Sequence, residues 1–190
     1  MWKTIVQAKI SEQAKVLLQT TQDNSPLPLY IERVKSGDPE NIEAQAARIY
    51  WQKLFGPAFR RDKDIPGINS FLNYGYAVIR AAVARAIVGS GLHPSLGLHH
   101  HNQYNSLCLA DDLVEPLRPA VDIKVYEIHK TQTVEPELTP DNKKVLLKVL
   151  SQDCTINGQT LPLMVALHHY AASIKRVISG EDKGVEIPEL

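Results

Sequence analysis

Residues 69–88 read NSFLNYGYAVIRAAVARAIV, and this segment is the strongest indication of the fold. Its apolar residues are too numerous for a helix that buries a single stripe, and its alanines at positions 81, 82, 84 and 86 permit close approach of neighbouring helices. Gly89, Ser90 and Gly91 follow directly and end the pattern. We therefore predict one long, central and buried helix from Asn69 to Val88.

Helical spacing of apolar residues continues on both sides of this stretch. Asp38, as N-cap, and Pro39, in the first helical position, open the helix that precedes the central one. No segment shows a clear strand period, so we predict an all-α, multi-helix fold. We expect one helical domain over residues 1–180 and a flexible tail over 181–190. The helices are expected near residues 2–20, 27–36, 38–55, 69–88, 107–117, 121–129, 140–151 and 161–179, with turn-rich connectors at 21–26, 57–67, 91–105 and 131–140.

Bulk composition excludes several classes of protein. The 190 residues are 44% hydrophobic with a formal net charge of zero, which argues against a generically basic nucleic-acid binder but leaves room for local basic stripes. Cys108 and Cys154 lie among apolar neighbours, which favours two buried thiols in an intracellular protein. We found no apolar run approaching the roughly 20 residues that span a bilayer, and we expect a cytoplasmic protein with no membrane partner.

Three segments carry residues suited to metal chemistry. In GDPENIEAQAARIYW, residues 37–51, Glu43 lies among small apolar residues and is either a solvated glutamate or a partly buried ligand. In HPSLGLHHHNQYN, residues 93–105, the loop carries four histidines, any of which is either exposed or functional. In CLADDLVEPLRP, residues 108–119, Asp112 and Glu115 are three apart and share a helix face.

The chemistry of these side chains indicates which metal they would suit. Carboxylates with one imidazole favour Mg²⁺ or Mn²⁺, and the imidazole tilts the choice toward Mn²⁺. A structural zinc site would need thiolates, and the spacing of the two cysteines does not suit one.

These segments, in this order, resemble those of the CRISPR-associated integrase (Cas protein one), the metal-dependent endonuclease of spacer acquisition. INSFLNYGYAVIRAAVARAIVGSGLHPSLGLHH is similar to its long central helix and histidine loop, and LGLHHHNQYN resembles the type II branch. The resemblance covers roughly residues 2–180. It implies that Glu43, His100 and Glu115 are the catalytic metal ligands, with His101 an alternative to His100, and Asp112 a supporting acid.

The same resemblance implies insertion of short DNA into a repeat array by phosphoryl transfer, with Mg²⁺ or Mn²⁺ as cofactor. The implied partners are double-stranded DNA, a second copy in a homodimer, the small adaptation protein (Cas protein two) and other type II CRISPR proteins. Members of the family usually begin with a β-rich domain that this sequence lacks, so we expect a fragment. Candidate DNA contacts, each also open to a plain surface or packing role, are Arg48, Arg60, Arg61, Lys63 and Tyr74.

Two other functions are compatible with the residues. A helical metal-dependent nucleotide phosphohydrolase would also be rich in histidine and aspartate, although such enzymes usually pair the two side by side, and His101 is followed by Asn102. A non-catalytic module that only self-associates is the other alternative.

Overall fold

In the computed structural model, which describes residues 1–22, 25–131 and 137–190, helices make up almost all of the regular structure. The all-α prediction is confirmed. The order along the chain is α1 (Trp2–Thr21), α2 (Leu27–Arg33), α3 (Ile42–Phe55), α4 (Ile68–Gly89), α5 (Cys108–Val114), the 3₁₀ turn η1 (Glu115–Leu117), α6 (Arg118–Thr131), α7 (Pro140–Leu147), the 3₁₀ turn η2 (Lys148–Ser151), β1 (Asp153–Ile156), β2 (Gln159–Pro162) and α8 (Leu163–Ile178).

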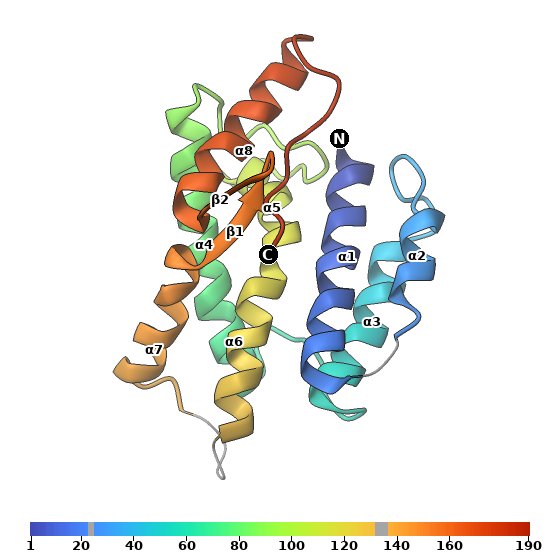
Figure 1. Cartoon of the computed structure of the whole chain (residues 1–190), viewed down its shortest axis with the longest axis vertical. Coiled ribbons are helices and arrows are strands. Elements are labelled where there is room, and N and C mark those ends of the chain that lie inside the picture. The colour runs from blue at the N-terminus through green and yellow to red at the C-terminus, as the bar shows by residue number, and fades with distance from the viewer. Residues whose placement is uncertain (23–24, 132–136) are drawn as a thin grey trace.

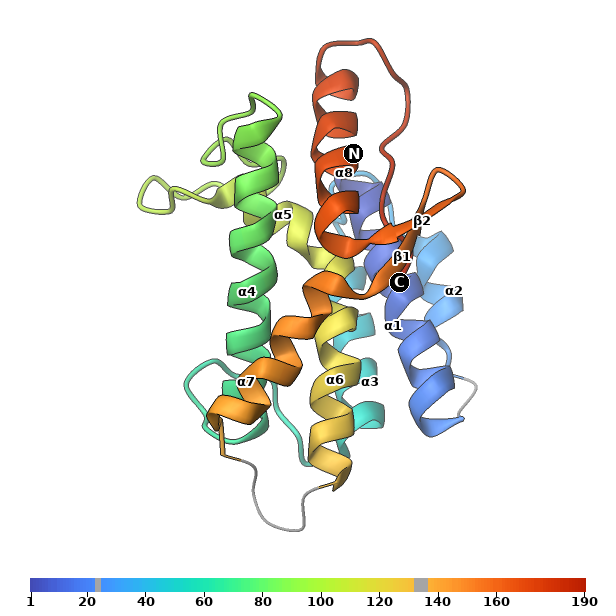
Figure 2. The same cartoon turned by 60° about the vertical axis from the view of Figure 1, so that its left-hand side comes forward.

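The helices form two groups with a column of helix between them (Figure 1). On one side, α1 packs against α2 and α3; on the other, α4 packs against α7 and α8. The column consists of α5, η1 and α6, which touch α1 on one side and α4 on the other. Figure 2 shows α4 and α6 running side by side with α7 crossing near their ends. Functional side chains from either group can therefore meet at the column.

The central helix is where the sequence placed it. Contrary to the expectation that no apolar run approaches a membrane-spanning length, α4 is long and apolar enough to cross a membrane by length and composition alone, yet 44% of that window is buried inside the protein. It packs against α5, α6 and α8, which accounts for its apolar character. Gly75 is needed for this packing, because an added Cβ would lie 2.3 Å from Cγ1 of Val121 on α6.

The structure corrects several expected boundaries. α3 begins at Ile42, and Asp38 stands outside the helix with φ +47°, although its carboxylate still accepts from the first α3 amides. The two helices expected near 107–117 and 121–129 are one nearly continuous run from Cys108 to Thr131, interrupted by the η1 turn at Pro116. The expected connectors at 21–26 and 131–140 lie partly outside the described residues.

A β-hairpin was missed. β1 and β2 pair antiparallel around Asn157 and Gly158, both at positive φ. Strands of four residues are too short to show a period-2 pattern, and the tight Asn-Gly turn was the available signal.

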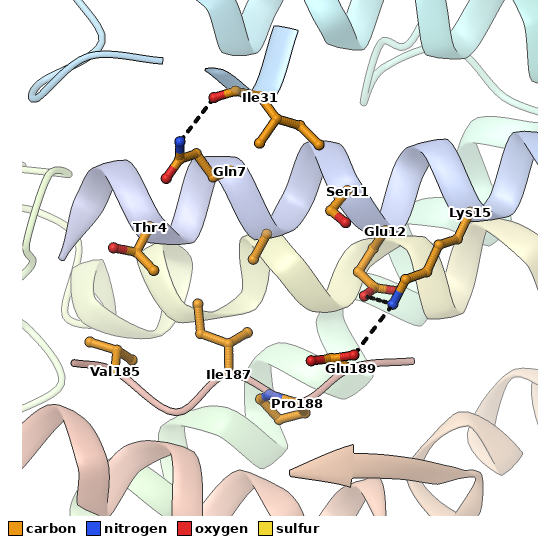
Figure 3. Close-up of a pocket in the computed structure, with 11 residues that line it drawn as sticks. Thr4, Gln7, Ser11, Glu12, Lys15, Ile31, Val185, Ile187, Pro188 and Glu189 are labelled. Atoms are coloured by element: carbon orange, nitrogen blue, oxygen red, sulfur yellow. Dashed lines mark hydrogen bonds and ion pairs between the residues drawn. The ribbon is translucent and has the colours of Figure 1, made fainter. Parts of the chain in front are cut away.

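The C-terminal segment extends this hairpin. Glu189 exchanges two backbone hydrogen bonds of 2.8 Å with Thr155, and Lys15 on α1 lies 3.9 Å from the Glu189 carboxylate and 2.7 Å from Glu12. Figure 3 shows the resulting groove of about 460 Å³ between α1 and this segment. The expected flexibility of residues 181–190 stays a prediction, although the segment makes these tertiary contacts.

We expect Gly75→Ala to destabilise the protein by about 1–2 kcal/mol, because overpacking at Val121 exceeds the gain in helix propensity. Chemical denaturation measures this loss. The same substitution in a Val121→Ala background removes the obstructing methyl groups, so its cost should fall to near zero. An equal cost in both backgrounds would show that α4 and α6 do not meet at this contact.

Candidate functional site

A buried lysine joins two of the predicted ligands. Lys9, on α1, is 8% exposed, and its Nζ lies 2.5 Å from Oε1 of Glu43 and 2.6 Å from Oε2 of Glu115. Glu43 comes from α3 and Glu115 from η1, so carboxylates 72 residues apart in sequence meet at one ammonium group. A buried ammonium requires such partners, because an unpaired charge in the interior is very costly.

Local structure fixes where each carboxylate lies. Both carboxylate oxygens of Asp38 accept hydrogen bonds of 2.9 Å from the amides of Ile42 and Glu43, which anchors the first turn of α3. Glu115 begins the 3₁₀ turn η1, which contains Pro116 and packs directly on α1. The two acids therefore have little freedom of backbone position.

Glu115 is held as an anion by cations on two sides. Burial raises the pKa of Glu115, but the Lys9 ammonium and the Arg118 guanidinium, 2.8 Å from Oε1, outweigh it, and the pKa ends below its ordinary value. For Lys9, burial lowers the pKa, while the Glu115 and Glu43 carboxylates raise it above its ordinary value. The ion pairs thus favour the charged forms of Glu115 and Lys9.

The histidine loop is organised by Asp112. This carboxylate is fully buried and accepts from the backbone amides of Leu98, His99 and His100 at 2.5, 3.0 and 3.2 Å. Oδ1 also lies 2.6 Å from Nδ1 of His100. Gly97 lets the loop approach so closely, since a Cβ there would come within 2.3 Å of the His100 carbonyl oxygen.

α1 supports the loop as well as the carboxylates. The Trp2 ring stacks on His99, with centroids 4.3 Å apart and planes 1° apart, and meets the edge of His100 at 5.9 Å. Trp2 and Lys9 are seven residues apart, or two helical turns, so they lie on the same face of α1. One face of α1 therefore contacts all three predicted ligands: Lys9 contacts Glu43 and Glu115, and Trp2 contacts His100.

His100 faces solvent on the open side of this cluster. Its side chain is 46% exposed, and the Nδ1 contact with Asp112 leaves Nε2 available to a ligand. His100 also contributes to lowering the Glu115 pKa, so it lies within electrostatic reach of that carboxylate. His101 is exposed. Across residues 1–22, 25–131 and 137–190, no three His, Cys, Asp or Glu side chains already form a metal-binding group, and the metal site stays a prediction.

A second buried acid lies along the same column of helix. Asp122 is fully buried and accepts hydrogen bonds from Tyr50, at 2.9 Å, and from Tyr76. Burial raises the Asp122 pKa to about 7, although both tyrosines and Arg118 oppose that rise. The Arg118 guanidinium lies over the Tyr76 ring at 4.7 Å, so it links this network to Glu115.

The predicted DNA-contact residues do not all gather. Arg48, Arg60 and Arg61 line a groove of about 540 Å³ that also contains Ala44 and Trp51 of the Glu43 helix. Arg61 is tied to α4 by hydrogen bonds to Asn69 and Asn73. Lys63 is exposed and is not one of the residues that line this groove. Tyr74 is half-buried, and its ring centroid lies 5.8 Å from Nζ of Lys143.

Comparison with known proteins identifies the family. The family model described as CRISPR associated protein Cas1 matches residues 1–154. The chain belongs to the Cas1 family. It is 39% identical, over its whole length, to a CRISPR-associated endonuclease Cas1 of Neisseria meningitidis, and it spans 63% of the length of that relative.

Solved structures share the fold of this Cas1 chain. A casposase bound to its integration product superposes with a TM-score of 0.78 over 98% of this chain and 65% of its own, at 20% identity. A chain of a Cas6-RT-Cas1–Cas2 complex gives a TM-score of 0.71 over 95% of this chain and 24% of its own, at 19% identity. At these identities the likeness establishes the fold alone.

Sequence reasoning missed Lys9, Trp2 and Arg118. A signal for Lys9 was present, because it follows Ile5 by four residues and so continues the apolar stripe of α1, where an unpaired lysine would be costly. Trp2 gave no comparable signal, because its partner ring is 97 residues away in the sequence. Arg118 lies three residues after Glu115, a spacing that permits an ion pair within one helical run.

We expect Asp112→Asn to loosen the histidine loop and to cost roughly 2–4 kcal/mol, because three amides and His100 lose a buried anionic acceptor. Hydrogen exchange of the Leu98, His99 and His100 amides reports the loss directly. Asp111→Asn is the control, since Asp111 pairs with Arg80 on α4. Unchanged protection of the three amides in Asp112→Asn would contradict this assignment.

Glu115 should make stability depend on pH. Its folded pKa lies below the ordinary value of 4.5, so its stabilising effect is complete above that pH and is lost as pH falls through the folded pKa. Near neutral pH, Glu115→Gln should lower the free energy of unfolding by roughly 3–5 kcal/mol. In denaturation series from pH 7 down to pH 3, that difference should shrink. A constant difference would exclude the charge as its cause.

Proposed function

We propose that this chain carries the catalytic centre of a metal-dependent DNA endonuclease and integrase of CRISPR adaptation, which inserts short DNA spacers into a repeat array. The observation that carries the proposal is the meeting of Glu43 and Glu115 at one cationic group, Nζ of Lys9. Family membership supports the reaction class, and the Neisseria meningitidis relative is consistent with the type II branch.

The donor set fits Mg²⁺ or Mn²⁺. Glu43 and Glu115 offer carboxylate oxygens, and His100 offers an imidazole nitrogen whose ring is oriented by Asp112. Hard oxygen donors with one imidazole are the ligands that these ions accept. A bound ion would polarise the phosphate that is attacked and stabilise the charge of in-line displacement.

The side chains of this chain have three separate roles in the proposed reaction. Glu43, His100 and Glu115 would hold the ion, while Asp112 and Trp2 contact His100 and position its ring. Arg48, Arg60 and Arg61 offer positive charge to DNA phosphates in the groove beside the Glu43 helix. A 3′-hydroxyl of the incoming DNA, or water, attacks phosphorus as the old P–O bond breaks, so no covalent enzyme intermediate is needed.

The proposed partners follow from the same assignment. Double-stranded DNA is the substrate, and a second copy of the chain and the small adaptation protein complete the working assembly, with other type II CRISPR proteins as further partners. The similarity to a chain of a Cas6-RT-Cas1–Cas2 complex supports the small adaptation protein as a partner. We place the protein in the cytoplasm, where its DNA substrate lies.

The test compares Glu43→Ala, His100→Ala and Glu115→Ala with the parent in strand transfer and in cleavage of branched DNA, with Mn²⁺ and with Mg²⁺. Because the chain spans 63% of the length of its Neisseria meningitidis relative, the substitutions are best made in a complete member as well. Each should lower turnover at least about 100-fold, since it removes a ligand of the ion that stabilises the transition state.

Glu40→Ala is the matched control, because Glu40 lies just before the same helix but pairs with Lys35 at the surface. It should retain full activity. Undiminished turnover in all three ligand variants would refute the metal centre. Hydrolysis of mononucleotides without action on branched DNA would indicate a nucleotide phosphohydrolase instead.

A further inference from the structure

Lys9 occupies a position that a metal ion at the proposed centre would need. Its Nζ lies within 2.6 Å of one oxygen of Glu43 and one of Glu115. An ion of the size of Mg²⁺ bound to the same two oxygens would lie about 2.0–2.1 Å from each. Two cations cannot share that space, since they would overlap and repel one another.

Charge balance leads to the same conclusion. Among the four groups that these ion pairs join, the two carboxylates of Glu43 and Glu115 are matched by the two cations of Lys9 and Arg118, so that set is formally neutral. Adding a doubly charged ion to a neutral, largely buried cluster gains little electrostatic energy. Release of the ammonium restores the negative charge that attracts the ion.

The surroundings allow Lys9 to leave. The Glu43 side chain is 25% exposed and His100 is 46% exposed, so the cluster opens toward solvent on that side. A lysine ammonium is a compact charge on a flexible four-carbon stem, and it can turn outward while the helix stays in place. Arg118 is less free, because it also packs over the Tyr76 ring.

We propose that Lys9 is an exchangeable internal counter-ion of the metal centre: its ammonium holds Glu43 and Glu115 together and must be displaced when the divalent ion binds. Lys9 therefore sets the metal concentration at which the centre loads, because its ion pairs compete with the metal for the same oxygens. This inference rests on the proposed function, since it takes the same two carboxylates as metal ligands.

The principal experiment measures Mn²⁺ affinity by titration calorimetry, and by electron paramagnetic resonance of the free ion, for the 190-residue chain. Lys9→Met should bind Mn²⁺ roughly tenfold more tightly than the parent, because the competing cation is gone. Its melting temperature should also rise more on addition of Mn²⁺. Lys15→Met is the matched control, since Lys15 lies on the same helix and pairs with Glu12 away from the site.

A second measurement keeps the test decisive if Lys9→Met does not fold. Acetylation of lysines in the parent chain, followed by mass spectrometry, should find Lys9 protected relative to Lys15, which is 41% exposed in its side chain. Saturating Mn²⁺ should raise the labelling rate of Lys9 several-fold and leave Lys15 unchanged. Glu115→Ala should abolish the effect of Mn²⁺.

The outcomes separate the two proposals. If Mn²⁺ binds the parent and Glu115→Ala abolishes binding, but Lys9→Met binds no more tightly or the Lys9 labelling rate does not respond, the counter-ion role is overturned and the metal centre stands. If neither the parent nor Lys9→Met binds Mn²⁺, the metal centre fails, and the role of Lys9 fails with it.

Discussion

The surrounding structure depends on the buried ion pairs of Lys9 with Glu43 and Glu115. They bring α1, α3 and η1 to one point, and none of these elements can move far without leaving a charge unpaired in the interior. Hydrophobic packing alone would tolerate a shift of one helix along another, since apolar contacts are non-directional. The ion pairs therefore set the register of the N-terminal helices against the central column.

Two further buried acids extend this control along the column. Asp112 holds the histidine loop through three backbone amides, while Asp122 ties Tyr50 of α3 and Tyr76 of α4 to α6. Arg118 stands between them, with Glu115 on one side and the Tyr76 ring on the other. The packing of the core and the geometry of the candidate site are therefore coupled, because the same buried side chains contribute to both.

The arrangement also gives α1 a role beyond packing. One face of that helix carries Trp2, which stacks on the histidine loop, and Lys9, which holds the carboxylates. Its other side meets the C-terminal segment through Lys15 and Glu189 (Figure 3). A helix that opens the chain thus connects the candidate site with the last residues, and its placement affects both.

The helical class, the central helix at 69–88 and the acidic and histidine segments could all be predicted from the sequence. Each of these features is indicated by residues close together in the sequence, either by the spacing of apolar residues or by the side-chain types of a short motif. The sequence also indicated that Asp112 and Glu115 share a face, since residues three apart on a helix always do.

Which distant groups meet could be seen only in the folded protein. Three such contacts depend on how the helices and the histidine loop pack together. Lys9 lies between Glu43 and Glu115, Trp2 stacks on His99, and Asp112 holds the loop. The short hairpin at 153–162 also depends on tertiary contacts. A two-stranded hairpin is marginal by itself, and here α8 and the C-terminal segment pack beside its four-residue strands. Local spacing carries no information about such contacts, which depend on how the whole chain minimises exposed apolar surface and unpaired buried charge.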